Sequence, residues 1–272
     1  MDTDFKQLAK AANAIRRGII RQIFHAGSGH PGGSLSAADI AAVLYFSEMR
    51  VDPQDPRSPG RDKFVLSKGH AAPMLYAALA ERGYFPRAEL DQLRKLGALL
   101  QGHPSVKIPG VEMSTGSLGQ GFSVAVGMAL AARLDGGGRV YVLLGDGELE
   151  EGIVWEAAMS AAHYKLDNLC AIIDWNGLQI DGRNEEVMTV APIGEKFASF
   201  GFHALSIDGH SLPAIADAFA EARAHKGSPT VVVAKTVKGK GVSFMENEAG
   251  WHGKAPNAAE ASQAMAELGG VL

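Results

Sequence analysis

The chain has 272 residues, of which 46% are apolar and 21% charged, a composition that suits one large α/β domain or two smaller ones with a sizeable buried core. A formal net charge of −4 gives no indication of nucleic-acid binding or of attraction to an acidic membrane surface. The single cysteine, Cys170, excludes an internal disulfide, and the sequence has neither an apolar run of transmembrane length nor the apolar core of a signal peptide, so we expect a cytoplasmic protein.

Apolar periodicity and glycine or proline breaks divide the chain into alternating helices and strands. Helices are expected over residues 3–25, 36–48 (opened by Ser36), 71–82, 87–96, 123–133, 152–165, 211–225 and 257–269. Strands are expected over 64–66, 139–144, 169–173, 203–207 and 230–235, and loops over 27–33, 52–62 and 97–121. This order predicts an α/β fold, a parallel sheet with helices on both faces, in a single domain over residues 1–272.

Two oxygen donors follow neighbouring strands in the middle of the chain. Asp146 follows the expected strand 139–144, and Asn176 follows the expected strand 169–173. Ligands bind at the carboxyl edge of open α/β sheets, so both side chains are expected at one binding edge. Their oxygens suit a hard cation such as Mg²⁺, which usually shares its ligands with phosphate, and the glycines beside Asp146 would let phosphate approach the backbone. A Gly-Asp-Gly tripeptide alone is a common turn and carries little information.

Four histidines stand beside glycine in expected loops, namely His30, His70, His103 and His252. A single histidine in such a place is more often structural or solvated than functional. Four together favour a site for anionic or hydroxylated ligands, because exposed loop backbone near histidine suits such groups.

The stretch from Gly145 to Gly182, GDGELEEGIVWEAAMSAAHYKLDNLCAIIDWNGLQIDG, resembles the thiamine diphosphate motif of the transketolase family, which begins with Gly-Asp-Gly and closes on an asparagine. The resemblance continues, in family order, through SGHPGGSLSAAD (28–39), SKGHAAPMLYAAL (67–79), GHPS (102–105), STGSLGQGFSVAVGMA (114–129), KTVKGKGVSFMEN (235–247) and WHGKAP (251–256). It spans nearly the whole chain and implies a thiamine diphosphate-binding fold.

The resemblance also implies a cofactor site. The cation would be held by the side chains of Asp146 and Asn176 and by the backbone carbonyl of Leu178, with Mg²⁺ expected and Ca²⁺ or Mn²⁺ as alternatives. His70 and Gly116 would contact the diphosphate. The implied cofactor-binding residues are His70, Gly116, Leu118, Asp146, Gly147, Glu151, Asn176 and Ile180.

The residues that the resemblance assigns to catalysis are His30, His103, His252 and Glu156. The histidines would line a funnel for sugar hydroxyls and would move protons or donate hydrogen bonds to developing oxyanions. Glu156 and Glu151 match glutamates of an acidic network near the family's dimer interface, although a helix-face glutamate paired with lysine is the other interpretation of Glu156. Leu118 and Ile180 match residues that pack on the cofactor rings, and ordinary core residues would look the same.

The matching segments all belong to the diphosphate half of the family. The pyrimidine half, which supplies a glutamate that activates the cofactor, has no counterpart in this sequence. The resemblance therefore implies the N-terminal subunit of a split transketolase, which binds thiamine diphosphate together with a C-terminal subunit, in a heterotetramer. The implied reaction transfers a two-carbon ketol unit from a ketose phosphate to an aldose, by default in pentose phosphate metabolism, while the sugars stay open.

Three alternatives remain at this point. One is a subunit of another thiamine diphosphate enzyme, related to deoxyxylulose phosphate synthase or to a 2-oxo acid dehydrogenase, although the SKGH, GHPS and WHGKAP segments favour transketolase. Another is a Rossmann-type nucleotide-binding module, because GSLGQG (116–121) has the right glycine spacing, but no convincing strand precedes it. The last is an inactive regulatory subunit.

Overall fold

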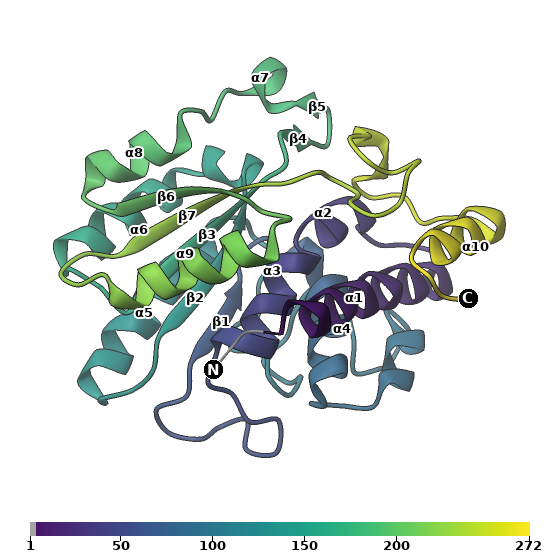
Figure 1. The fold of residues 1–272 in the computed structure, drawn as a ribbon, viewed down its shortest axis with the longest axis horizontal. Helices are drawn as coiled ribbons and strands as arrows, with labels where there is room; N and C mark the ends of the chain where they lie inside the picture. The colour runs from purple at the N-terminus through teal and green to yellow at the C-terminus, as the bar shows by residue number, and fades with distance from the viewer. Residues whose placement is uncertain (1–3) are drawn as a thin grey trace.

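The computed structural model describes residues 4–272 and has a parallel sheet at its centre (Figure 1). The sheet is five-stranded, in the order β1-β2-β3-β7-β6. Its strands are β1 (Lys63–Leu66), β2 (Val140–Gly145), β3 (Leu169–Trp175), β6 (His203–Asp208) and β7 (Thr230–Lys235). A separate antiparallel pair, β4 (Leu178–Gln179) and β5 (Gly182–Arg183), follows β3. The expected α/β fold with a parallel sheet is confirmed.

Helices cover both faces of this sheet, because alternate strand residues point to opposite sides and both sets are apolar. Val142 and Ile173 belong to the core on one face, and Tyr141 and Ile172 to the core on the other. The first face is covered by α5 (Gln120–Leu134), α6 (Gly152–His163) and α8 (Ile193–Phe200). The second face carries α3 (Ala38–Val43) and α9 (Leu212–Ala224), with α1 (Phe5–Ala26), α4 (Ala72–Arg82) and α10 (Ala258–Glu267) packed farther out (Figure 1).

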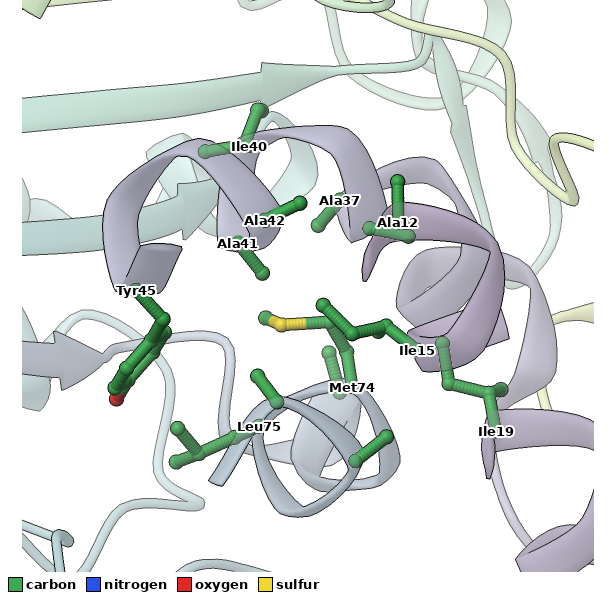
Figure 2. Close-up of a cluster of buried hydrophobic side chains, with 14 of the residues drawn as sticks. Ala12, Ile15, Ile19, Ala37, Ile40, Ala41, Ala42, Tyr45, Met74 and Leu75 are labelled. Atoms are coloured by element: carbon green, nitrogen blue, oxygen red, sulfur yellow. The ribbon is translucent and has the colours of Figure 1, made fainter. Parts of the chain in front are cut away.

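Small side chains allow α1, α3 and α4 to pack closely beside the sheet. Ala41 of α3 points toward Met74 of α4, and Ala42 of α3 and Ile15 of α1 belong to the same cluster (Figure 2). All four side chains are fully or almost fully removed from solvent. This packing holds α3 between the sheet and α1. The segment that leads into α3 contains His30, one of the predicted site residues.

The structure corrects the sequence prediction around residues 27–48. The expected loop 27–33 ends early, because α2 (Pro31–Ser36) begins at Pro31, whose fixed φ suits the first turn of a helix. Ser36 does not open the next helix; it ends α2, and its hydroxyl donates to Oδ2 of Asp174 at 2.5 Å. The remainder of the expected helix is α3, followed by a π-helical turn at Leu44–Glu48.

Other boundaries also differ. Residues 87–96 form only a short 3-10 helix, Arg87–Gln92, and α8 lies in a region for which no helix was predicted. The first predicted helix is α1, and Thr3, at which the prediction began, lies outside the described residues. GSLGQG leads into α5 from an irregular segment, so the strand that a Rossmann motif requires is lacking there. No helix within residues 4–272 combines the length and apolar character that crossing a membrane requires.

The parallel sheet places four loops side by side. Strands β1, β2, β3 and β7 are neighbours in that order, so the residues after their carboxyl ends share one edge. Lys68, Asp146, Asn176 and Lys238 lie on these four loops. The edge therefore brings together two cations and two oxygen donors from distant parts of the sequence.

Core packing gives a first testable prediction. Phe219 of α9 is fully buried with its ring centroid 5.8 Å from that of Tyr141, whereas Phe46 is 37% exposed. Phe219→Ala should lower the free energy of unfolding by about 3–5 kcal/mol, because it removes contacts and leaves a cavity. Phe46→Ala should cost about 1 kcal/mol. Urea denaturation of both variants measures this, and equal losses would contradict the assignment of the core.

Candidate active site

A cavity of about 250 Å³ lies at the carboxyl edge of the sheet, beside these four loops. It is lined by His30, Gly33, Lys68, His70, Gly116, Leu118, Gly145, Asp146, Gly147, Glu148, Asn176, Leu178, Gln179, Ile180, Lys238 and His252. All residues predicted for the site are among them except His103, Glu151 and Glu156. The sequence prediction therefore converges on one place in the fold.

His103, Glu151 and Glu156 lie outside this cavity. His103 is exposed, and its ring packs against Gly116, where an added Cβ would lie 3.2 Å from His103 Cδ2. It thus borders the cavity through Gly116. Glu151 and Glu156 are exposed at the start and on the outer face of α6, so their predicted role in a subunit interface stays a prediction.

The loops after β2 and β3 hold Asp146 in a fixed orientation. Its Oδ1 accepts a hydrogen bond from Gly147 N at 2.9 Å, and its Oδ2 accepts one from Gly177 N at 2.5 Å. Burial raises the pKa of this carboxyl, and the hydrogen bond from Gly177 opposes that rise. A divalent cation would favour the ionised form further, because an opposite charge nearby stabilises a buried carboxylate.

Asn176 and Leu178 supply the other oxygens of the predicted cation site. Asn176 Oδ1 accepts from Leu178 N at 3.1 Å, which orients the amide oxygen. The Leu178 carbonyl accepts from the ammonium of Lys238 at 2.9 Å, so it already contacts a positive charge. Among the described residues, no group of three His, Cys, Asp or Glu side chains suits a metal ion. Asp146, Asn176 and Leu178 instead form an all-oxygen set of the kind that a hard cation prefers.

Three histidine rings pack as a triangle on one wall of the cavity. The ring centroids of His30, His70 and His252 lie 5.2–5.4 Å apart. Burial lowers the pKa of His30 to about 4 and that of His252 to about 3, and it holds the pKa of His70 well below its ordinary value. The charges of Lys68 and Lys238 act in the same direction on His70 and His252. The rings are therefore neutral near pH 7, and each offers one N–H donor and one acceptor nitrogen.

Lys238 connects the histidines to the cation site. Its ammonium is almost fully buried, with Nζ 2.9 Å from the Leu178 carbonyl and 3.0 Å from Nδ1 of His252. Burial lowers the pKa of Lys238 to about 8. A lysine in this position adds positive charge to a cavity that is expected to receive an anion.

A second buried lysine, Lys68, forms the floor of the site. Its ammonium donates to the Gly33 carbonyl at 2.7 Å and pairs with the carboxylate of Asp174. Asp174 also accepts from the hydroxyls of Ser36 and Thr236. Burial alone would raise the pKa of Asp174, but Lys68 and the two hydroxyls hold it below its ordinary value. This cluster ties α2, the end of β3 and the loops after β1 and β7 together beneath the cavity.

Glu148 plays a structural part. It is buried, and its carboxylate accepts from Gly119 N at 2.7 Å and from Gly145 N at 3.0 Å, and also from the hydroxyl of Ser67. Glu150, on the same turn, is exposed and bonded to Gln179 at 2.9 Å. Glu148 therefore joins the loop before α5 to the end of β2 and shapes the cavity wall.

Unpaired polar atoms mark where a ligand would bind. Nδ1 of His30 is buried without a hydrogen-bond partner. The side chain of Asn184 is 3% exposed and lies beside Asp146, where its hydrogen bond opposes the rise that burial causes in the pKa of that carboxyl. Buried polar groups are normally satisfied, so the free nitrogen of His30 fits a polar ligand in the cavity. The residues present thus fit a cation with its phosphate ligand.

The sequence prediction missed Lys68, Lys238, Glu148 and Asp174 as parts of the site. Lys68 and Lys238 stand next to glycine in the quoted segments SKGH and KGKG, which was an available signal. Glu148 lies within an acidic run and resembles a solvated residue until its burial is known. Asp174 is recognisable only through its contact with Lys68, which is distant in sequence.

The buried His30 predicts a dependence of stability on pH. The folded chain keeps His30 neutral down to pH about 4, whereas the unfolded chain binds this proton below its ordinary pKa of 6.5. The unfolded state therefore binds more protons in this window, and stability should fall as the pH drops from 6.5 to 4. Denaturant unfolding should show a smaller fall for His30→Gln than for the wild type. His163→Gln, a control at the end of α6 outside the cavity, should follow the wild type, and an unchanged slope in His30→Gln would refute this account.

Known proteins resemble this chain over almost all of its length. A family described as "Transketolase, thiamine diphosphate binding domain" matches residues 7–270. The 6-deoxy-6-sulfo-D-fructose transketolase subunit SqwG of Clostridium sp. (strain MSTE9) is 47% identical, over 90% of this chain and 90% of that protein. A subunit of the apulose-4-phosphate transketolase of Phocaeicola vulgatus is 42% identical, over 93% of this chain and 90% of that protein.

Full-length transketolases match over part of their own length. Transketolase of Homo sapiens is 47% identical over 91% of this chain, which spans 40% of the human protein. The crystal structure of transketolase from Campylobacter jejuni superimposes with a TM-score of 0.93 at 33% identity, covering 99% of this chain and 44% of that one. Because the family match spans nearly all residues and the cavity holds most of the residues expected of it, the chain belongs to the transketolase N-terminal, thiamine diphosphate-binding family.

Proposed function

We propose that this chain is the diphosphate-binding subunit of a two-component transketolase. The observation that carries the proposal is the cavity at the carboxyl edge of the sheet, where Asp146, Asn176 and Leu178 meet a wall of neutral histidines. The relatives from Clostridium and Phocaeicola, both named as transketolase subunits, support it, because each matches this chain over nine-tenths of both lengths. Their transketolase names also favour this activity over a synthase or 2-oxo acid dehydrogenase.

Thiamine diphosphate with Mg²⁺ is the cofactor that fits this cavity. When bound, the cofactor supplies a carbon nucleophile and an electron sink for breaking a bond next to a carbonyl group. Asp146, Asn176 and the Leu178 carbonyl would hold the cation. Lys238 would place its positive charge beside the diphosphate, and the glycines next to Asp146 leave the backbone open to it.

The histidines would form hydrogen bonds with the sugar and transfer protons to or from it. In a neutral state, His30 can donate a hydrogen bond to a hydroxyl or carbonyl oxygen and accept a proton at its other nitrogen, whereas His252, whose Nδ1 accepts from the Lys238 ammonium, can donate from Nε2. His252 is oriented by Lys238, at 3.0 Å from its Nδ1, and His30 packs edge-on against it. His103, exposed beside Gly116, would meet the sugar farther from the cation site.

The proposed reaction transfers a two-carbon ketol unit from a ketose phosphate, or a related anionic ketose, to an aldose. The partner is a C-terminal subunit that contributes the pyrimidine side of the site, and we propose a heterotetramer of two subunits of each kind. Such an obligate interface should bury more than roughly 2,000 Å². The two relatives are named after different sugars, so the sugar that this enzyme uses has to be identified by an activity assay.

The cation site is tested by Asp146→Asn. This change removes the only anionic side chain among the three proposed ligands and should weaken binding of thiamine diphosphate in Mg²⁺ by at least about 10-fold. Glu150→Gln, on the exposed side of the same turn, is the matched control and should bind like the wild type. Isothermal titration measures both. Wild-type affinity in Asp146→Asn would remove Asp146 from the site.

The two-component nature is tested by reconstitution. The chain alone, saturated with thiamine diphosphate and Mg²⁺, should show no ketol transfer from a ketose phosphate to ribose 5-phosphate, because none of its cavity residues is a glutamate placed to activate the pyrimidine. Glu148 is the one glutamate in the cavity lining of the described residues, and its carboxylate already accepts hydrogen bonds from two backbone N–H groups. Adding the C-terminal partner should restore aldose phosphate release. Robust turnover by the lone chain would overturn the two-component proposal.

A further inference from the structure

A cluster of three largely buried polar side chains lies outside the cavity lining, beside the segment that carries Lys238. Arg16 of α1 donates to both carboxylate oxygens of Asp39 of α3, at 3.1 and 2.5 Å. His210, on the loop after β6, has its Nδ1 2.8 Å from Oδ2 of the same carboxylate. The three side chains are 7%, 9% and 15% exposed, and none of them lines the cavity. The proposed reaction therefore gives them no direct role.

The backbone determines which nitrogen of His210 carries the proton. The N–H of Val237 lies 2.8 Å from Nε2, and a backbone N–H can only donate. Nε2 is therefore the acceptor, and the ring proton is on Nδ1, where it faces Asp39. Burial alone would raise the pKa of Asp39, but His210 and Arg16 hold it below its ordinary value. His210 thus connects a carboxylate of α3 to the peptide that immediately precedes Lys238.

The same cluster also holds the chain on the other side of Lys238. Nε of Arg16 donates to the Lys240 carbonyl at 3.1 Å. The approach is close, because a Cβ added to Gly241 would lie 3.1 Å from Arg16 Cδ. The cluster therefore contacts the backbone one residue before Lys238 and two residues after it.

The ammonium of Lys238 depends on this support from the backbone. Its Nζ lies 2.9 Å from the Leu178 carbonyl and 3.0 Å from Nδ1 of His252, and both partners are uncharged. An ion pair between Arg16 and Asp39 would be enough to hold α1 against α3. The contact of His210 with Val237 adds nothing to that packing, and its consequence is the position of the residue that follows.

We propose that His210, held by Asp39, is a positioning residue that fixes Lys238 for binding of thiamine diphosphate through the N–H of Val237. The inference rests on the cofactor and function proposed above, and it adds a residue from outside the cavity. His210 acts on the cofactor only through Lys238, so the two residues should be energetically coupled.

Two substitutions separate the two contacts of the His210 ring. The amide of glutamine reaches about as far as Nε2, so His210→Gln can still accept from Val237 N. The amide of asparagine reaches about as far as Nδ1, so His210→Asn can donate to Asp39 but leaves Val237 N without its acceptor. In the full chain, with and without its C-terminal partner, His210→Asn should weaken binding of thiamine diphosphate in Mg²⁺ by about 10-fold, and His210→Gln should stay within about twofold of the wild type. His210→Ala, which also lacks an acceptor, should match His210→Asn.

A double-mutant cycle tests whether the effect passes through Lys238. Lys238→Met should itself weaken binding, and adding His210→Asn to it should cause no further loss. Additive losses would overturn the proposal, as would wild-type affinity in His210→Asn. The matched control is His203→Asn at the opposite end of β6, where Nε2 also faces a carboxylate, that of Glu221 at 2.8 Å. This control should bind the cofactor like the wild type.

Unfolding in urea distinguishes positioning from a general loss of structure. His210→Asn and His210→Gln should lose similar free energy of unfolding, because each gives up one contact of the ring, while only His210→Asn loses affinity. Affinity that falls in proportion to stability across the variants would show a structural role only and would overturn the proposal.

Crystal structures of the chain without cofactor give a readout that does not depend on the proposed function. Lys238 Nζ, 2.9 Å from the Leu178 carbonyl in the wild type, should leave this carbonyl in His210→Asn and stay beside it in His210→Gln. If the wild type bound no cofactor, or turned over no sugar with its partner, the proposed function would fail and this displacement would decide the inference. An ammonium that does not move in His210→Asn would overturn it.

Discussion

The buried ion pair between Lys68 and Asp174 is the contact on which the rest of the site depends. It lies beneath the cavity, where both side chains are removed from solvent. Two charges in such a place persist only when their remaining hydrogen bonds are satisfied, and removal of one partner typically costs about 3–5 kcal/mol. Ser36, Thr236 and the Gly33 carbonyl satisfy them here. The pair therefore fixes the segment that follows His30 relative to the ends of β3 and β7.

The same pair determines the electrostatics of the cavity. Since Asp174 neutralises Lys68, Lys238 is the cation that has no paired carboxylate within the cavity lining of the described residues. Its pKa is lowered to about 8 by burial, and the pKa values of His30, His70 and His252 are all lowered by burial as well. The cavity thus disfavours further positive charge on the protein while keeping N–H donors exposed to a ligand. An anion with its own divalent cation suits this balance better than either ion alone.

The sequence was sufficient for the parts of the site that depend on local pattern. Strands with continuous apolar runs identified β2 and β3, and Asp146 and Asn176, which follow them, both line the cavity at the carboxyl edge of the sheet. Contacts between distant segments could not be found in this way. Ser36 is of a residue type that often caps helices, but its hydroxyl donates a hydrogen bond to Asp174. Helix α2, which ends at Ser36, resembles a loop in the sequence because two of its residues are glycines. Glu148 and Lys238 acquire their roles through burial, which no periodicity indicates.

The cavity is open to solvent on one side, because part of its apolar wall is exposed. Ile180 lines it and is 69% exposed, while Met188, farther along the same segment, is 58% exposed. Contact with one face of a flat ring removes only that face from water, and the hydrophobic gain is roughly proportional to the area removed. An aromatic cofactor at Ile180 would therefore bind more tightly when a second protein surface covers the opposite face. The exposed wall, together with the exposed Glu156 and Met159 of α6, fits the proposed half of a shared site, in which this chain would supply the groups that hold the cation and move protons and the partner would complete the enclosure.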